Sequence, residues 1–248
     1  MVTSVVPAAG SKDQAETIKK LAEVKRDAEG GDMNAQFSLA GSYHFGVGVG
    51  INVVEALKWY TRAADAGLGI AQCTLGACYA KGDGVPLSQV DAFKWWRRAA
   101  DGGEVIAMYS LAQCYENGFG VALDTRQAMG WLTRAAGAGL VQAQAKLGFC
   151  YATGTNIGIN KREMVRWWTK AAEAGHAEAM RNMGVCFANG DGVAVDMIQA
   201  ISWYARAAGA GDKDAQVQLD RLRGPSPPPL PLPLPLPLPL PPTFSPLD

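Results

Sequence analysis

The sequence has few of the residues that metal, nucleic-acid and membrane sites require. Only two of its 248 residues are histidine, which leaves little room for a histidine-based metal site. The 23 Lys plus Arg residues balance 23 Asp plus Glu residues, so no positive excess exists for nucleic acid or an anionic membrane surface. No apolar run reaches the roughly 18 residues of a membrane helix, and residues 1–10 lack the basic and apolar regions of a signal peptide. We therefore expect a cytoplasmic protein with no cofactor, no metal site, and no nucleic-acid or membrane partner.

A 36-residue period runs through most of the chain and predicts a stacked array of one structural unit. A tryptophan column repeats five times at this spacing: Trp59, Trp95, Trp131, Trp167 and Trp203. A glycine column follows it by eight residues: Gly67, Gly103, Gly139, Gly175 and Gly211. Small, large apolar and aromatic columns keep the same period, so the units share one fold.

Each unit is expected to form two helices joined by a glycine turn. In the second unit, Ala71, Leu75 and Tyr79 lie on one stripe of the first helix. Gly76 lies beside that stripe, where a small residue lets a neighbouring helix approach. The turn repeats Gly-x-Gly-Val, and Asn156 replaces its second glycine in the fourth unit. Asparagine tolerates positive φ better than most residues, so the turn geometry is retained.

Two polar columns mark the start and the end of the second helix. The N-cap column holds Asn52, Ser88, Asp124, Asn160 and Asp196. Acidic or glutamine residues three positions later approximate a capping box. A cation column occupies the last turn: Arg62, Arg98, Arg134, Lys170 and Arg206. We interpret these cations as partners of the negative end of the helix dipole, with an anion-binding stripe as the alternative.

Four of the five cysteines share one column of the first helix: Cys78, Cys114, Cys150 and Cys186. Successive members are expected about 9–10 Å apart, which exceeds the reach of a disulfide. We expect them to be buried, unpaired thiols in a reducing compartment. A four-cysteine zinc site is the alternative, but its ligands would lie too far apart.

These columns together resemble a known repeat. The pattern is small-Gln-x-x-Leu-Gly-x-x-Tyr, then Gly-x-Gly-Val and a cap, then Ala-x-x-Trp-x-x-Arg-Ala-Ala-x-x-Gly. It resembles the Sel-1-like repeat, a relative of the tetratricopeptide repeat. The resemblance implies an all-α, right-handed α/α superhelix (an HCP-like solenoid) that acts as a protein-binding adaptor or scaffold. We expect a disordered segment at 1–12, a capping helix at 13–31, five repeats at 32–211, a partial sixth repeat at 212–223 and a disordered tail at 224–248.

The first helices present a variable face that is a candidate partner-binding surface. If this array resembles its family, that face lines the inner curve of the solenoid. Aromatic anchors and polar groups on it are Tyr109, Gln113, Glu116, Lys146, Phe149, Arg181, Asn182 and Asn189. The alternative is a solvated helix face with no ligand.

Catalysis has little support in the sequence. His44 and His176 are 132 residues apart, and neither has a nucleophile or carboxylate partner within its own repeat. Some members of the family have been named as β-lactam hydrolases, but the chain has no Ser-x-x-Lys motif. We therefore predict a non-catalytic interaction scaffold. A β-lactamase-like hydrolase and a secretory-pathway quality-control adaptor are the alternatives that the family suggests.

The C-terminal segment differs in kind from the repeats. Residues 224–248 contain 12 prolines and seven leucines, in strict alternation from Pro229 to Pro241. This proline density excludes a helix and predicts extended polyproline II. The spacing fits ligands of WW or Src-homology 3 domains, so the tail is a second candidate contact. The alternative is a low-complexity expansion with no ligand.

Overall fold

The computed structural model describes residues 12–223, and within this range it contains twelve α-helices and no strand. The helices are α1 (Lys12–Glu29), α2 (Met33–Phe45), α3 (Val53–Asp65), α4 (Gly69–Lys81), α5 (Gln89–Asp101), α6 (Val105–Asn117), α7 (Thr125–Gly137), α8 (Val141–Thr153), α9 (Lys161–Glu173), α10 (Ala177–Asn189), α11 (Met197–Gly209) and α12 (Lys213–Arg223). The predicted all-α solenoid is confirmed. The predictions for the two chain ends, 1–11 and 224–248, lie outside the described residues.

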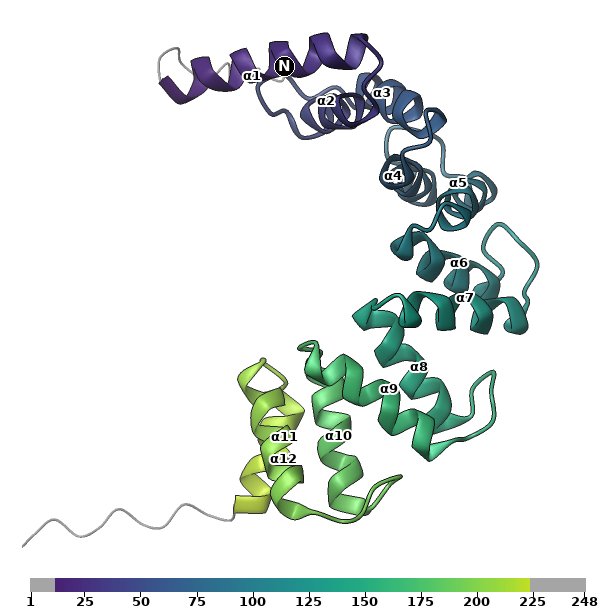
Figure 1. The fold of residues 1–248 in the computed structure, drawn as a ribbon, viewed down its shortest axis with the longest axis vertical. Coiled ribbons are helices and arrows are strands. Elements are labelled where there is room, and N and C mark those ends of the chain that lie inside the picture. The colour runs from purple at the N-terminus through teal and green to yellow at the C-terminus, as the bar shows by residue number, and fades with distance from the viewer. Residues whose placement is uncertain (1–11, 224–248) are drawn as a thin grey trace, which may run out of the picture.

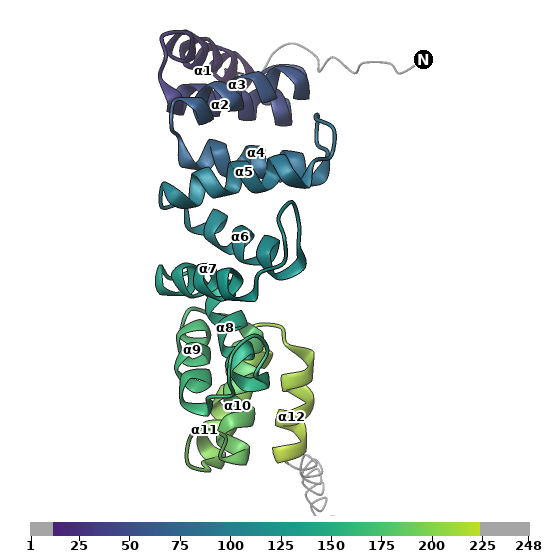
Figure 2. The same ribbon diagram turned by 90° about the vertical axis from the view of Figure 1, so that its right-hand side faces the viewer.

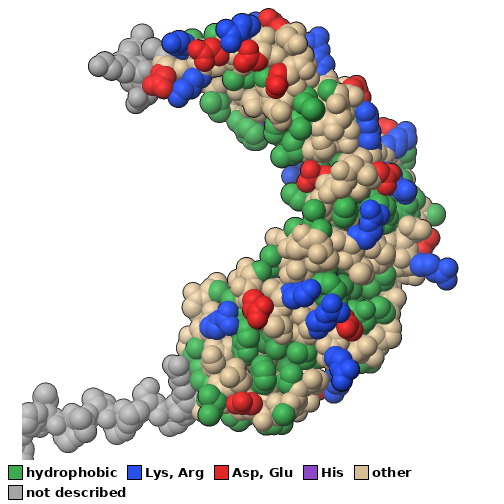
Figure 3. All heavy atoms as spheres, in the orientation of Figure 1, with side chains coloured by type: hydrophobic (Ala, Val, Ile, Leu, Met, Phe, Trp, Pro, Cys, Tyr) green, Lys and Arg blue, Asp and Glu red, His purple; other side chains and the backbone are tan. Residues whose placement is uncertain are grey.

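The helices stack in pairs along a curved axis (Figures 1 and 2). The main contacts join helices that are neighbours in sequence, as expected of a repeat array. Figure 1 shows α4 on the inner side of the arc and α5 on its outer side. We call the face formed by the first helices of the repeats, α2, α4, α6, α8 and α10, the inner face. Over the coloured residues of Figure 3, charged side chains of both signs are interspersed along the arc.

The predicted N-caps form, but the capping box is only half made. The Asn52 side chain accepts a hydrogen bond from Glu55 N at 3.0 Å, and the other four members of its column cap their helices in the same way. The backbone N–H of Asn52 donates to the Tyr43 carbonyl at 2.8 Å, where a reciprocal capping box would use the Glu55 side chain. The same bond recurs in each repeat: the backbone N–H of every N-cap residue donates to the backbone carbonyl of an aromatic residue near the end of the first helix. These aromatic residues are Tyr43, Tyr79, Tyr115, Tyr151 and Phe187. Asn156 has φ 63°, which confirms its predicted left-handed conformation.

The cation column stacks on the tryptophan column, a contact that the dipole interpretation did not include. The Arg134 guanidinium lies 4.2 Å from the Trp131 ring centroid, and Arg206 lies 4.1 Å from that of Trp203. The other three repeats make the same contact at 4.5–5.5 Å. Cation–π attraction therefore adds to the dipole at the end of each second helix.

Glycines on the first helices let aromatic rings of the second helices approach closely. A Cβ added to Gly148 would lie 2.6 Å from Trp168 Nε1 and 2.9 Å from its Cγ. Gly76 faces Trp96 in the same way, which confirms the prediction made for Gly76. Both indoles complete the contact with a hydrogen bond, because each Nε1 donates to a carbonyl of the facing helix at 3.2 Å.

Buried glutamines join three of the repeats to the helix before them. Gln72 Nε2 donates to the Ala64 carbonyl at 2.9 Å, and Gln36 and Gln144 make the equivalent bond eight residues back. These carbonyls lie in the last turn of the preceding helix, where each also accepts a hydrogen bond from the backbone N–H of the glycine that follows it, at 3.1 Å. The glutamine column of the repeat pattern thus caps a helix C-terminus inside the core.

The core contains alanines, leucines, methionines, aromatic residues and the cysteine column. Leu39, Leu75, Leu111 and Leu147 are at most 1% exposed. The column of Cys78, Cys114, Cys150 and Cys186 is buried, and all five cysteines are free. At the ends of the array, α1 buries Ala28, and α12 buries Ala215 and Leu219. The predicted inward-facing thiols are therefore confirmed.

Candidate functional site

Two hollows lie beside α6. The first, which we call the aromatic hollow, has a volume of about 290 Å³ and lies among α6, α8, α9 and α10. Its walls are Tyr109, Gln142, Ala145, Lys146, Phe149, Trp168, His176, Glu178, Ala179 and Asn182. The second, which we call the amide hollow, has a volume of about 300 Å³ and lies among α4, α5 and α6. Its walls are Ala80, Gln89, Ala92, Trp96, Ser110, Gln113, Cys114, Asn117 and Phe119.

The aromatic hollow brings together four of the eight predicted partner-binding residues. Tyr109 comes from α6, Lys146 and Phe149 from α8, and Asn182 from α10. Phe149 is 53% exposed although it is a large apolar side chain, so a bound partner can cover it. Trp168 forms a fixed wall, because its ring packs on Gly148 and its Nε1 donates to Ala145 O.

Three predicted polar residues of this face already have partners within the solenoid. Lys146 forms an ion pair with Glu116 of the preceding repeat. Arg181 Nε lies 3.0 Å from Asp212 Oδ2 in the following repeat, and its Nη2 lies 3.7 Å from Glu178. These pairs hold adjacent repeats in register, so the cations are bound before any ligand arrives.

The pKa of the Asp212 carboxyl depends on this ion pair and on the position of Asp212 at the start of α12. Burial alone would raise the pKa of its carboxyl. Hydrogen bonds from Ala215 N and from Arg181 outweigh this effect and hold the Asp212 pKa below its usual value. The carboxylate therefore stays charged and paired at neutral pH.

His176 has a role that the sequence analysis did not find. Its Nδ1 accepts a hydrogen bond from Ala179 N at 3.2 Å, so it serves as the N-cap of α10. The equivalent residues before α4, α6 and α8 are Leu68, Glu104 and Leu140, and none of these three makes a side-chain cap. Among these four first helices, only α10 has a side-chain cap, from His176. This bond directs the imidazole into the wall of the aromatic hollow.

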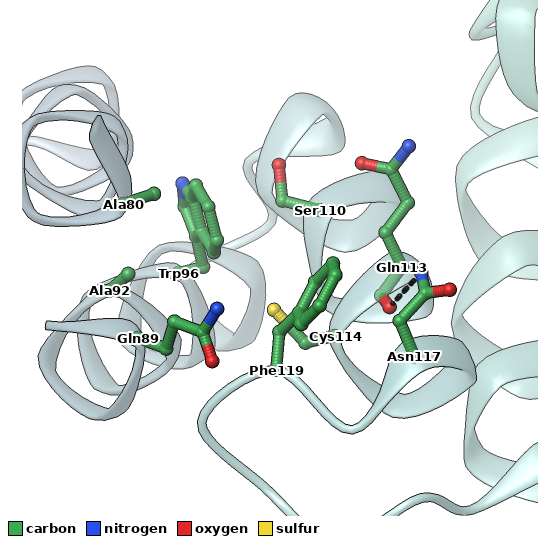
Figure 4. A pocket seen from close by; sticks show the side chains of 9 residues that line it. All are labelled: Ala80, Gln89, Ala92, Trp96, Ser110, Gln113, Cys114, Asn117 and Phe119. Atoms are coloured by element: carbon green, nitrogen blue, oxygen red, sulfur yellow. Dashed lines mark hydrogen bonds between the residues drawn. The ribbon is translucent and has the colours of Figure 1, made fainter.

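The amide hollow holds one predicted residue, Gln113 (Figure 4). Trp96 and Phe119 form two of its walls, with the Cys114 sulfur between them in the view. Burial raises the pKa of the Cys114 thiol to about 11, so the thiol stays protonated at neutral pH. Asn117 Nδ2 donates to the backbone carbonyl of Gln113 at 2.9 Å, so this bond leaves the Gln113 carboxamide unused.

The remaining predicted residue, Asn189, lies apart from both hollows. It is exposed at the C-terminal end of α10, next to the glycine turn. Glu116 and Arg181 also do not line either hollow, although each pairs with or lies beside a residue that does. Of the eight predicted residues, four line the aromatic hollow, Gln113 lines the amide hollow, Glu116 and Arg181 form ion pairs, and Asn189 lies apart.

The second histidine joins two repeats. His44 Nε2 lies 3.2 Å from Asp83 Oδ2, a carboxylate in the turn of the next repeat. The pair crosses between repeats, so the expectation that His44 has no carboxylate partner within its own repeat does not exclude it. Among residues 12–223, no group of three or more His, Cys, Asp or Glu side chains is arranged to hold a metal ion. The helices of this range also include none that is long and apolar enough to cross a membrane.

Comparison with known proteins agrees with the repeat period. The family model of the Sel1 repeat matches residues 34–68, 69–104, 105–140, 141–176 and 177–212. The chain belongs to the Sel1 repeat family. Sel1 repeat solenoids commonly serve in protein–protein interaction, and no curated protein matches this one significantly in sequence.

Solved structures place this Sel1 repeat chain among bacterial relatives. It is 31% identical to a protective antigen of uropathogenic Escherichia coli strains, with TM-score 0.77, over 80% of this chain and 43% of that one. It is 33% identical to a Sel1 repeat protein from Oxalobacter formigenes, with TM-score 0.77, over 82% of this chain and 59% of that one. An immunity protein from Pseudomonas aeruginosa shares the fold at 16% identity, with TM-score 0.52, over 84% of this chain and 85% of that one. The Sel1 repeat chain thus spans about half the length of the first two relatives.

Proposed function

We propose that this Sel1 repeat chain is a non-catalytic scaffold that binds an extended segment of a partner protein across the aromatic hollow. The observation that carries the proposal is the meeting of Tyr109, Phe149 and Trp168 from three different helices. Aromatic side chains at the centre of a contact supply most of the binding energy in protein interfaces. Extended concave surfaces are also the way in which repeat arrays bind their ligands.

Free amide groups beside these rings suit a peptide backbone. Within residues 12–223, the carboxamides of Gln142 and Asn182 make no hydrogen bond to other protein groups. Each carboxamide offers both a donor and an acceptor, which matches the alternating N–H and C=O groups of an extended chain. Lys146 and Glu178 line the same wall, where they are paired with Glu116 and Arg181, so the free polar groups are the carboxamides. The hollow therefore fits a peptide with an apolar or aromatic anchor flanked by polar groups.

The test is peptide selection on the full chain, followed by substitution of the anchors. A random peptide display library is selected on immobilised protein, and the enriched peptides are then measured by isothermal titration calorimetry. Tyr109→Ala and Phe149→Ala are each expected to weaken binding by roughly 30-fold, the effect of losing about 2 kcal/mol at an interface anchor.

Val54→Ala and Ile198→Ala are the matched controls. Both residues are exposed apolar side chains, at 62% and 80%, and both lie on second helices away from the hollow. They are expected to leave the affinity within twofold. Equal losses in the controls and in the anchor variants, or peptides that bind all four variants unchanged, would exclude the aromatic hollow as the site.

A further inference from the structure

The amide hollow has a composition unlike that of its neighbour. None of its nine lining residues carries a formal charge, whereas the aromatic hollow contains Lys146 and Glu178. It presents the carboxamides of Gln89, Gln113 and Asn117 beside the rings of Trp96 and Phe119 (Figure 4). The Gln89 and Gln113 side chains make no hydrogen bond within residues 12–223. The site is therefore uncharged, aromatic and supplied with hydrogen-bond donors.

The C-terminal segment has the complementary chemistry. Residues 224–247 contain no Asp, Glu, Lys, Arg or His, and the charge of Asp248 comes last. Proline has a carbonyl but no N–H, so an alternating Pro-Leu run offers about twice as many acceptors as donors. In polyproline II these carbonyls are not used internally. Aromatic-lined grooves with donors on their rims are the usual receptors for such segments.

We infer that the amide hollow binds the Pro-Leu run of the chain's own C-terminal segment. The leucine and proline side chains would lie between Trp96 and Phe119, and the carboxamides would donate to the carbonyls of the run. This site is separate from the aromatic hollow, and the inference stands whether or not a partner binds there. The segment would act as a tethered ligand on the inner face.

The length of the chain permits this contact. The last described helix, α12, is three first-helix positions from α6, in the order α12, α10, α8 and α6. From α12 to α6 the chain makes six successive helix–helix contacts at about 10 Å each, so the path is at most about 60 Å. The stretch from Gly224 to Pro242 covers about 59 Å at the polyproline II rise of about 3.1 Å per residue. The alternating run is therefore long enough to reach the hollow.

Because the segment is tethered to the solenoid, even a weak intrinsic affinity is sufficient for it to occupy the amide hollow. A tether whose length matches the span gives the segment an effective concentration of about 1 mM. With an intrinsic Kd of about 0.1 mM, the tethered segment weakens the apparent affinity of a competing free peptide roughly elevenfold. This competition is measurable without any knowledge of an external partner.

The experiment compares two full-length chains that differ only in the run. The first is the natural chain, and the second carries Leu232→Ser, Leu234→Ser, Leu236→Ser and Leu238→Ser, which keeps every proline and the chain length. The side-chain amide resonances of Gln89, Gln113 and Asn117 are followed by NMR, and those of Gln142 and Asn182 in the aromatic hollow serve as an internal reference. We expect the first three to shift between the chains and the reference pair to stay. Leu247→Ser, outside the run, is the matched control and should shift neither set.

A titration completes the test. A synthetic peptide of residues 227–242 should bind the serine-substituted chain roughly tenfold more tightly than the natural chain. Adding Gln113→Ala and Phe119→Ala to the serine-substituted chain should abolish this binding. Unshifted amide-hollow signals with equal peptide affinities would overturn the inference, as would shifts in the aromatic hollow instead. Shifts that revert on tenfold dilution would also overturn it, because the occupant would then be the segment of a second copy.

Discussion

Replacing Gly148 with alanine tests how closely the two helices of a repeat approach each other. The new Cβ would lie 2.6 Å from Trp168 Nε1, well inside van der Waals contact, so the indole must move. Overpacking of this kind costs about 1–3 kcal/mol. Moving the ring also weakens its hydrogen bond to Ala145 O, at about 1 kcal/mol. Alanine has a higher helix propensity than glycine, which offsets about 1 kcal/mol of this loss in stability. We expect the variant to be destabilised by about 1–3 kcal/mol.

Gly130→Ala provides the matched control. Gly130 lies inside α7, and a Cβ added there meets nothing within 4 Å. The same substitution then gains helix propensity without a clash, and we expect it to stabilise the protein by about 0.5–1 kcal/mol. The two changes are chemically identical, so the difference between them reports the ring contact alone.

The chain itself contains the compensating pair. One repeat earlier, the positions of Gly148 and Trp168 are held by Ala112 and Leu132, which are both buried. Trp168→Leu in the Gly148→Ala background should therefore recover at least 1 kcal/mol relative to the sum of the two single changes, a coupling typical of contacting residues. Urea unfolding followed by far-ultraviolet circular dichroism measures all four chains. If Gly148→Ala were as stable as Gly130→Ala, or if the double change were simply additive, the close-approach argument would fail.

Three further outcomes follow from the burial and charge of particular groups. Burial raises the pKa of Cys73, Cys114 and Cys186 to about 11, so these thiols should react with a disulfide reagent at pH 8 far more slowly in the folded chain than in urea. Because the Asp212 pKa is lowered on folding, its contribution to stability is present above its unfolded value near 3.8 and is lost as the pH falls through the lower folded value. Asp212→Asn should therefore flatten the decline of the urea midpoint between pH 5 and 2, whereas the exposed Asp220→Asn should not. Finally, a chromogenic cephalosporin should be turned over no faster by the full chain than by buffer, and turnover that tracks the purified protein would refute the non-catalytic assignment.

The sequence determines the repeat columns strongly, because each column has one environment that recurs in every unit. The N-caps, the Asn156 turn and the buried cysteine column all follow from position within the period. The stacking of Arg134 on Trp131 is also periodic, but the helix dipole alone accounts for a cation in the last turn, so the sequence does not require the ring contact. The buried Gln72 was visible in the pattern and was given no role. A glutamine that recurs among apolar positions requires a partner, and this rule would have found the Ala64 carbonyl.

The inner face could not be resolved in the same way, because its contacts cross between repeats and vary from one repeat to the next. Glu116 and Lys146 are 30 residues apart, and Arg181 and Asp212 are 31 apart. Each pair is therefore five or six residues short of one 36-residue period, so it joins a residue of one first helix to a residue five or six positions earlier in the next repeat. Opposite charges at this spacing predict inter-repeat ion pairs in any array of the same period. Removing such pairs from a list of candidate binding residues leaves the side chains that need an external partner, and in this chain these include Tyr109 and Phe149.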